Sequence, residues 1–599
     1  MDGSAGAPAA KKRGISKKLI VIVLVAVLAI AAIGAALVLS GGSTKGSGST
    51  VFRYGTITGN YDSLDPAVDY ETFGGEILQN VYETLVWYNG SSSSELIPLL
   101  ATEVPTVANG GISADGLTYI FTIRDGVTFS DGTVLKASDV EYSFDRAFLL
   151  NDPASPIPMY GQMLIPDYAN ETTYPASSFG SDGKIVPSIG QDVLDQHIWA
   201  HDNKVQFNLT QPYSAFLSAL AFNTASIVSE KYVEDHGGLT KDGYDFMSSN
   251  AMGTGPYMVG EIKKDSYTKL VANDNYWRGA PTLKTIIITQ YSEMSAMIMA
   301  LKNGDLDAAA IPRTQMASVE NIANVSIISG YPTLTLDFFG LNENLNVAGA
   351  DPKKTNVPST FFQDRNVRMA FASAFNYEQY INTTMQGMAI QPNGVIPKGM
   401  FGYDASVPTY SYDLEAAAAY LRNATNGASN WLDTGFNIEL YYSAGNTARE
   451  TACLLLKAGL ESLSDKINVT VTPLELSTLI GYQSSHKMPV MFLGWAPDYA
   501  DPDDYVHPFY LSSGLYASTI GYKNETIDSL VTQAATELND TKRAELYHDI
   551  SMAMHDECAY IWTVQATSFF VGYNYIQGYY YNPMYSNLYY YALSMAPSK

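Results

Sequence analysis

The stretch DGLTYIFTIRDGVTFSDGTVLKASDVEYSFDRA, from Asp115 to Ala147, combines several local structural signals. The dipeptides Asp115-Gly116 and Asp131-Gly132 are typical of tight turns, and they flank segments in which apolar and polar residues alternate. Ser138 followed by Glu141 predicts a capping box that opens a helix. The stretch therefore predicts strands joined by turns and followed by a helix. We expect its residues to shape the fold rather than to bind a ligand.

The rest of the chain mixes strand and helix patterns in irregular alternation, as in α/β proteins. The predicted strands are Leu117–Ile123, Lys204–Leu209, Lys284–Thr289, Asn437–Tyr442 and Pro489–Leu493. The predicted helices are Gly75–Val86, Ala137–Leu149, Met294–Asn303, Asn366–Met385, Leu414–Arg422 and Thr447–Ser462. The last of these helices lies between two strand-like segments, which predicts a βαβ unit.

Length and composition exclude several classes of protein. The chain has 599 residues, 60 acidic and 35 basic side chains, and a formal net charge of −25. Single cores rarely grow past about 250–300 residues, so the length predicts more than one packed unit. Nucleic-acid binding requires a basic surface, and this charge argues against it. Two cysteines, Cys453 and Cys558, are too few for a disulfide scaffold; they either pair or remain buried thiols.

The N-terminus carries a predicted membrane anchor. Residues 19–39 are consecutive apolar positions, long enough as a helix to cross a hydrocarbon core of about 30 Å. The basic residues 1–18 then stay in the cytoplasm, and residues 40–50 form a Gly/Ser linker. The alternative is a cleaved signal, whose apolar part is usually only about 7–15 residues long. We therefore predict a cell-membrane protein with a single N-terminal anchor and an extracytoplasmic soluble body.

Further motifs follow one another in a fixed order along residues 51–599. They are Ser63–Pro66 (SLDP), the Asp115–Ala147 stretch, Gly253–Tyr257 (GTGPY), Asn275–Gly279 (NYWRG), Asn303–Asp307 (NGDLD), Phe361–Phe375, Gly399–Asp413, Gly494–Asp501 (GWAPDYAD) and Thr541–Tyr547 (TKRAELY). In this order the chain resembles the solute-binding proteins of ABC transporters, in their oligopeptide/dipeptide-binding family (family 5 extracellular solute-binding proteins). One such motif would be weak evidence, whereas the ordered series is specific.

The resemblance implies an α/β protein with a two-lobed periplasmic-binding-protein-like fold (type II) and an extra inserted domain, behind the N-terminal transmembrane helix. It implies that lobe I consists of residues 51–90, 206–330 and 560–599, the inserted domain of 91–205, and lobe II of 331–559. It also implies a monomer without a cofactor that captures oligopeptides and delivers them to an ABC permease and its ATPase subunits. The lobes would close over the ligand by a hinge.

The same resemblance implies a ligand site. In the family, the Asp of a Gly-Trp-X-X-Asp motif pairs with the α-ammonium of the peptide, while the Gly and the residue after Trp offer backbone hydrogen bonds. Carried over to this chain, the ligand-binding residues are Gly494, Ala496 and Asp498, with Trp495 as the wall of the cleft. A carboxylate shielded from water favours an ammonium group, and an indole face suits a cation or an apolar group.

Alternatives remain for several of these residues. Asp498 is otherwise a solvated loop position, and the acidic residues that follow it also suit a cationic ligand or calcium. Arg365 and Arg368 read as a structural ion-pair face, which leaves recognition of a peptide carboxylate unassigned. Trp562 is expected in the core rather than in the cleft. His197 and His201 lack a third ligand nearby, so no metal site is expected.

Enzymatic activity is not expected, because the chain contains no P-loop, no His-Glu-X-X-His and no Gly-X-Ser-X-Gly motif. The ligand could instead be an oligosaccharide or another small solute, since the 43 tyrosines would suit stacking on sugars. A structural or adhesive cell-surface protein is the alternative from another class. The charge of Asp498 distinguishes peptide from sugar, because an ammonium ligand needs it and a sugar does not.

Overall fold

The computed structural model describes residues 49–57, 59–168 and 173–596. The predicted basic N-terminus and transmembrane anchor, residues 1–39, lie outside the described residues, as does most of the predicted linker. Within the described ranges, no helix is long and apolar enough to cross a membrane.

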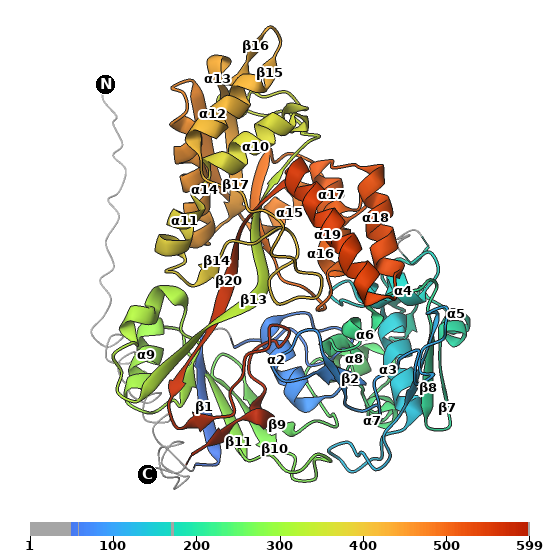
Figure 1. The fold of residues 1–599 in the computed structure, drawn as a ribbon. Coiled ribbons are helices and arrows are strands. Elements are labelled where there is room, and N and C mark those ends of the chain that lie inside the picture. The colour runs from blue at the N-terminus through green and yellow to red at the C-terminus, as the bar shows by residue number, and fades with distance from the viewer. Residues whose placement is uncertain (1–48, 58, 169–172, 597–599) are drawn as a thin grey trace, which may run out of the picture.

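One sheet of eleven strands runs through the molecule, in the order β18-β17-β19-β13-β20-β12-β1-β11-β10-β9, with β14 paired to β20 (Figure 1). Its centre is a pair of long antiparallel strands, β13 (Val325–Leu341) and β20 (Tyr560–Tyr573). In Figure 1 these strands cross from the lower part of the molecule to the upper part. We call the part with β17–β19 and α10–α19 the upper lobe, and the part with β1, β9–β12, α2 and α9 the lower lobe.

The strands and helices have the following bounds. The other strands of the large sheet are β1 (Val51–Thr56), β9 (Tyr257–Lys263), β10 (Tyr267–Ala272), β11 (Thr285–Gln290), β12 (Ala308–Ala309), β14 (Ala389–Ile390), β17 (Phe436–Ser443), β18 (Ile467–Leu474) and β19 (Val490–Trp495). The main helices are α2 (Thr72–Val81), α3 (Ala137–Leu150), α9 (Met294–Lys302), α10 (Arg365–Ala374), α12 (Leu414–Asn423), α14 (Thr447–Glu461), α15 (Leu476–Ser484), α16 (Asp503–Tyr510), α17 (Leu515–Ile520), α18 (Glu525–Thr536) and α19 (Asp540–Glu557).

Bulges interrupt the pairing of β13 with β20 where the two strands pass between the lobes. The register shifts between Ser329 and Tyr331, and again between Pro332 and Leu336. A bulge leaves a residue without a ladder partner and bends the strand that carries it. The connection between the lobes is therefore a pair of bent strands.

The predicted βαβ unit is confirmed. Strands β17 and β18 are parallel neighbours, with Phe436 opposite Ile467, and α14 connects them. Within β17, five consecutive residues after Asn437 are buried, which is typical of a strand covered on both faces. Helix α14 buries Ala452, Leu456 and Leu460 at helical spacing, so one face of it packs on the sheet.

The Asp115–Ala147 stretch folds as turns, a strand and a helix, as predicted. Gly116 and Gly132 both have a positive φ, 70° and 91°, which the tight turns require. The strand is β4 (Thr118–Thr122), which pairs with β8 (Lys204–Asn208); β8 also pairs with β7 (Ile198–His201) in a separate three-stranded sheet.

The predicted capping box of Ser138 and Glu141 is wrong. Helix α3 begins one residue earlier than Ser138, so Asp139 occupies its third position and accepts a hydrogen bond from the Lys136 backbone N–H at 2.8 Å. Glu141 instead accepts from the backbone N–H of Ala200 in β7, at 3.0 Å. Glu141 therefore ties the helix to the small sheet.

A buried ion pair joins two of the predicted motifs. Arg146 on α3 donates from both terminal nitrogens to the Asp65 carboxylate, and their side chains are 1% and 0% exposed. Asp65 belongs to the SLDP segment, and its other hydrogen bond, to the backbone N–H of Ala67, shapes that turn. This geometry agrees with a structural role for both motifs.

Two predicted helices end earlier than expected. The predicted helix Gly75–Val86 corresponds to α2, which ends at Val81; Val86 begins strand β2 (Val86–Tyr88), which pairs with β3 (Leu96–Pro98). The predicted helix Asn366–Met385 breaks after α10 because the Asn376 side chain accepts from the Gln379 backbone N–H and caps a new turn. Local capping and strand pairing thus override the apolar periodicity.

Cys453 and Cys558 are buried and unpaired. Burial raises the pKa of Cys558 to about 11, which keeps its thiol protonated at neutral pH. Of the two readings of these cysteines, the structure supports the buried thiols.

Candidate ligand-binding site

The segment Gly494–Asp498 begins at the end of β19, where this strand leaves the sheet. Gly494 lies opposite Asp337 of β13. A Cβ atom on Gly494 would lie 2.4 Å from the Asp337 carboxylate oxygen and 2.8 Å from the Arg449 guanidinium, so a larger residue here would displace these two side chains. The next backbone groups are open to solvent, because Ala496 is exposed. The segment therefore offers backbone groups next to charged side chains.

Trp495 is held in place by its neighbours on α16 and α17. Its indole N–H donates to the backbone carbonyl of Asp504 at 2.9 Å. Its ring meets Phe509 and Tyr516 edge to face, at centroid distances of 5.9 and 5.7 Å. Because both the ring edge and the N–H are occupied by the protein, the remaining exposed part of the ring forms a fixed wall.

Asp498 connects the two lobes. Its carboxylate accepts a hydrogen bond from the Tyr70 hydroxyl, which comes from the loop before α2 in the lower lobe. Its backbone N–H donates to the Asp504 carboxylate at 2.8 Å. Burial raises the pKa of Asp498, and the bond from Tyr70 opposes part of that rise. Burial, with the adjacent Asp498, raises the pKa of Asp504 well above its ordinary value.

The four carboxylates of this loop have different partners. Asp501 pairs with Arg543, and Asp503 accepts hydrogen bonds from the hydroxyls of Tyr213 and Tyr499. In contrast, Asp498 and Asp504 form no salt bridge with any cation of the described ranges. No group of three His, Cys, Asp or Glu side chains suited to a metal ion occurs in that part of the chain either. A cation from outside could therefore compensate the charge of Asp498 and Asp504.

Positive side chains gather at the other end of the segment. Arg449 on α14 donates to the Ser443 hydroxyl at 3.0 Å, and its guanidinium lies 4.0 Å from the Asp337 carboxylate. Arg313 donates to the Thr567 carbonyl at 3.2 Å. Burial raises the pKa of Asp337 to about 6, and Arg449 and Arg313 oppose that rise. Two guanidinium groups thus accompany one carboxylate beside Gly494.

Tyr516 lies between these two ends. Burial raises its pKa to about 12, and the Arg449 guanidinium opposes this rise, while Tyr516 in turn helps to raise the pKa of Tyr70. The hydroxyl of Tyr516 is therefore within electrostatic reach of both Arg449 and the Tyr70–Asp498 pair. The site is acidic at Asp498 and basic at Gly494, with aromatic rings between the two ends.

The four predicted site residues lie in one short segment of the sequence, at the end of β19. Sequence reasoning missed Tyr70, Arg313, Asp337, Arg449 and Tyr516, which come from distant parts of the chain and carry no motif signal. Arg365 and Arg368, which the sequence assigned to structure, donate to the backbone carbonyls of Asp556 and of Phe362 and Glu557, in agreement with that assignment.

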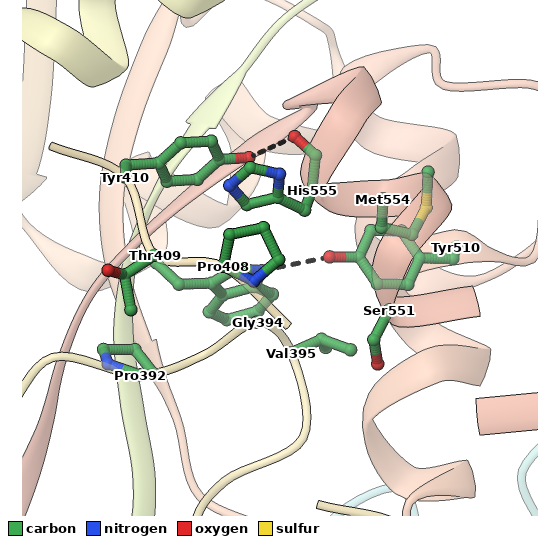
Figure 2. A pocket seen from close by; sticks show the side chains of 11 residues that line it. Pro392, Gly394, Val395, Pro408, Thr409, Tyr410, Tyr510, Ser551, Met554 and His555 are labelled. Carbon is green, nitrogen blue, oxygen red and sulfur yellow. Dashed lines mark hydrogen bonds between the residues drawn. The ribbon is translucent and has the colours of Figure 1, made fainter. Parts of the chain in front are cut away.

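Trp562 lies in the core, as expected. It is 3% exposed and donates its indole N–H to the Tyr510 hydroxyl at 3.0 Å. The cavity beside it, shown in Figure 2, has a volume of only about 10 Å³. There Tyr410 donates its hydroxyl to the His555 carbonyl and stacks on the His555 ring at 4.6 Å. A cavity of this volume holds about one water molecule and no solute.

Two α/β lobes joined by a pair of strands, with a charged and aromatic segment at a strand end, define the class of two-lobed binding proteins. The sequence model of the bacterial extracellular solute-binding proteins, family 5 (middle region), matches residues 95–517. The chain belongs to this family.

Two curated relatives of this chain are named for peptide binding. The chain is 25% identical over 527 residues to the probable D,D-dipeptide-binding periplasmic protein DdpA of Escherichia coli K12, covering 87% of this chain and 90% of that protein. It is 25% identical over 492 residues to the oligopeptide-binding protein OppA of Bacillus subtilis, covering 81% and 82%.

Solved structures share the fold. HbpA2 of Haemophilus parasuis matches with a TM-score of 0.72 and 20% identity, over 91% of this chain and 99% of that chain. The oligopeptide-binding protein AppA of Bacillus subtilis, solved with a nonapeptide, matches with a TM-score of 0.67 and 19% identity, over 92% and 100%.

Proposed function

We propose that this protein is an extracytoplasmic receptor that captures oligopeptides at Gly494, Trp495, Ala496 and Asp498 and delivers them to an ABC importer. In this proposal the N-terminal segment anchors the receptor to the membrane, and the importer consists of a permease and its ATPase subunits. The two curated relatives described above are named for peptide binding, which supports this class of solute.

The observation that carries the proposal is the pair of carboxylates at Asp498 and Asp504. Burial makes both expensive to ionise, and among the described residues no salt bridge from a cation reaches either of them. A peptide α-ammonium at Asp498 would supply the missing positive charge through a charge-assisted hydrogen bond. A neutral sugar would supply no such charge and would leave ionisation of the two carboxyls disfavoured.

The rest of the segment suits a peptide backbone. Ala496 and Gly494 offer backbone groups beside the Trp495 ring, and an extended peptide can add main-chain hydrogen bonds there. Arg449 and Arg313 at the Gly494 end carry one more positive charge than Asp337 compensates. A ligand carboxylate would find its counter-charge at that end.

Release to an importer would require the lobes to separate. The hydrogen bond from Tyr70 to Asp498 links the lower lobe to the segment, so opening of the lobes would break it. A ligand that binds both lobes would favour the closed arrangement by its differential affinity for that state.

The test is calorimetric titration of the full-length protein with trialanine, N-acetyl-trialanine and a neutral trisaccharide. We expect trialanine to bind, acetylation to weaken binding at least 10-fold, and Asp498→Asn to weaken trialanine binding similarly, since a hydrogen bond to a charged group contributes about 1.5–3 kcal/mol.

The control variant is Asp235→Asn, because Asp235 forms an exposed ion pair with Lys231 far from the segment. This variant should bind trialanine like the natural protein. Equal binding of free and acetylated peptide, or binding of the sugar alone, would contradict the proposal.

A further inference from the structure

A second cavity, of about 390 Å³, lies in the lower lobe between β12, β20 and the chain's C-terminal segment. Its lining includes four tyrosines from the C-terminal segment, Tyr579, Tyr580, Tyr581 and Tyr585, with Tyr54 from β1. Apolar residues such as Ala310, Ile57 and Phe569 also line it, together with the uncharged polar residues Ser568, Ser586 and Asn587. None of the described residues that line this cavity, which we call the tyrosine pocket, is charged.

Hydroxyl groups of the tyrosine pocket are largely satisfied by the protein. The Tyr585 hydroxyl accepts from the Trp87 indole N–H at 3.0 Å and lies 3.2 Å from the Tyr580 hydroxyl. The Tyr54 hydroxyl accepts from the Asn587 side chain at 3.2 Å. With these polar groups engaged, the pocket offers mainly ring faces and aliphatic surface to a ligand.

One apolar side chain of the pocket is unusually open. Ile57 is 43% exposed, although it follows directly on β1 and lines the cavity. Covering such a side chain with an apolar group is favourable, at about 25 cal/mol for each Å² removed from water. The volume of the pocket also lies within the range of about 300–1,000 Å³ that small-molecule sites occupy.

Two series of residue contacts, which we call bridges, connect the tyrosine pocket with the loop that contains Asp498. Tyr505 donates its hydroxyl to the Leu334 carbonyl, and its pKa is raised by burial and further by Asp504, Asp498 and Tyr581. On the same strand as Leu334, Tyr331 packs against Tyr581 at 6.1 Å. Tyr505 directly follows Asp504, so its contact with β13 connects the loop of Asp498 and Asp504 with the strand that meets Tyr581 in the pocket wall.

The second bridge runs through Trp87. This residue stacks on Tyr585 at 5.5 Å and precedes Tyr88, whose hydroxyl accepts from the Ala500 backbone N–H at 3.4 Å. Ala500 lies two residues after Asp498. The two series of contacts share no side chain, so they support the same placement independently.

Arg313 connects the pocket with the basic end of the segment. Its guanidinium lies 5.9 Å from the centroid of the Phe569 ring, and Phe569 lines the pocket. Arg313 also opposes the rise in the pKa of Asp337, the residue of β13 that pairs with Gly494.

We propose that the tyrosine pocket receives an uncharged aromatic or large apolar side chain of the captured peptide, and that the receptor selects its ligands by this side chain. The inference rests on the proposed peptide function. A peptide extended along Gly494–Asp498 directs alternate side chains to opposite faces, so one of them points away from the upper lobe and into the pocket. A charged side chain would lose its hydration there without gaining a partner.

The test compares trialanine with peptides that carry Phe or Lys at the first, second or third position, by calorimetric titration of the full-length protein. At one position, we expect Phe to bind roughly 10- to 100-fold more tightly than Ala, which corresponds to burial of most of a Phe side chain. Lys at that position should bind no better than Ala.

Two variants then assign the preference to the tyrosine pocket. Ala310→Phe fills the cavity and should bring the Phe-to-Ala affinity ratio close to 1. Ile57→Glu places a carboxylate at an exposed lining position and should reverse the preference from Phe towards Lys. The matched controls Val107→Phe and Val186→Glu change side chains that are 54% and 55% exposed elsewhere, and they should keep the natural ratio.

The outcomes are distinguishable from failure of the proposed function. If trialanine binds but Phe gives no advantage at any position, the pocket inference is wrong and the peptide function stands. The pocket inference is also wrong if the Ala310→Phe protein has the same unfolding temperature as the natural protein and keeps the full preference for Phe. If no peptide binds and a neutral sugar does, both proposals fail.

Discussion

Tyr70 and Asp498 are separated by 428 positions in the sequence and share a hydrogen bond that joins the two lobes. The tyrosine hydroxyl is the donor, and the aspartate belongs to the carboxylate pair with Asp504 that carries the proposed function. The tyrosine thus occupies, in this structure, part of the hydrogen-bonding capacity that an ammonium ligand would use. Contact between the lobes and binding of an ammonium ligand would therefore both involve the Asp498 carboxylate.

Removing this hydroxyl should change the pH dependence of binding. The bond from Tyr70 lowers the pKa of Asp498, so Tyr70→Phe should raise it, by about one unit if the bond contributes about 1.4 kcal/mol. The pH at which trialanine affinity falls to half should then rise by about the same amount. Calorimetric titrations between pH 5 and 8 measure this shift.

Tyr213→Phe serves as the control, because the Tyr213 hydroxyl donates to the structural Asp503 instead. It should leave the half-affinity pH in place. An identical pH profile in the Tyr70→Phe protein and the natural protein would separate Tyr70 from ligand binding.

Binding by the natural protein should weaken in acid. Burial raises the pKa of both Asp498 and Asp504, so at moderately low pH these carboxyls are protonated and attract an ammonium group less. Binding of a cationic ligand therefore releases protons. Titration of trialanine in two buffers of different ionisation enthalpy should show this release, and an unchanged heat between the buffers would count against the carboxylate pair as the ammonium site.

Thermal stability of the ligand-free protein should show the opposite trend. Burial raises the pKa of Asp69 to about 8 and those of Glu76 and Asp145 to about 7, against ordinary values near 4. At a pH between about 4 and the raised pKa values, the folded state binds more protons than the unfolded state. The stability of the folded state therefore increases as the pH falls from about 8 towards 5. The same stability is lost as the pH rises towards the raised pKa values, and the loss levels off above them.

Calorimetric unfolding at pH 5, 6, 7 and 8 measures this trend. The fully buried Glu76 offers a specific check, because Glu76→Gln removes one titrating group while its hydrogen bonds with Tyr590 and Asn587 can partly persist. The variant should show a shallower decrease of the unfolding temperature between pH 6 and 8. A steeper decrease in this variant would contradict the role of Glu76.

The ordered motifs indicated the family through their resemblance to known solute-binding proteins. The βαβ unit of β17, α14 and β18 could be predicted separately, because short apolar strands and long amphipathic helices leave clear periodic signals. The predicted domain boundaries remain a prediction. The errors at Val86 and at Asn376 arose where strand pairing and a side-chain cap ended an apolar pattern early.

The candidate site also contains residues that the sequence could propose and residues that it could not. Gly494 to Asp498 are contiguous and carry a motif, so the sequence could propose them, and their role remains a prediction. Tyr70 and Arg449 approach this segment only because β19 lies in the same sheet as β13 and the lobes come together. Local patterns in a single sequence do not show which residues, hundreds of positions apart, come into contact in the fold.

The buried pair of Arg146 and Asp65 gives the sharpest test of a purely structural motif. Neither side chain is more than 1% exposed, and Asp65 accepts from both terminal nitrogens of Arg146. Replacing one partner leaves the other charge buried without compensation. Arg146→Met should therefore lower the free energy of unfolding by about 3–5 kcal/mol, measured by denaturant titration.

Replacing both partners should cost much less than the single change. In a double variant, Asp65→Leu with Arg146→Met, no uncompensated charge remains, although the turn at Ala67 loses its acceptor. We expect the double variant to recover more than half of the stability lost in Arg146→Met. Both proteins should bind trialanine with natural affinity wherever they are folded, because the pair lies outside the Gly494–Asp498 segment. Loss of binding without loss of stability in Arg146→Met would show that this motif acts on the ligand after all.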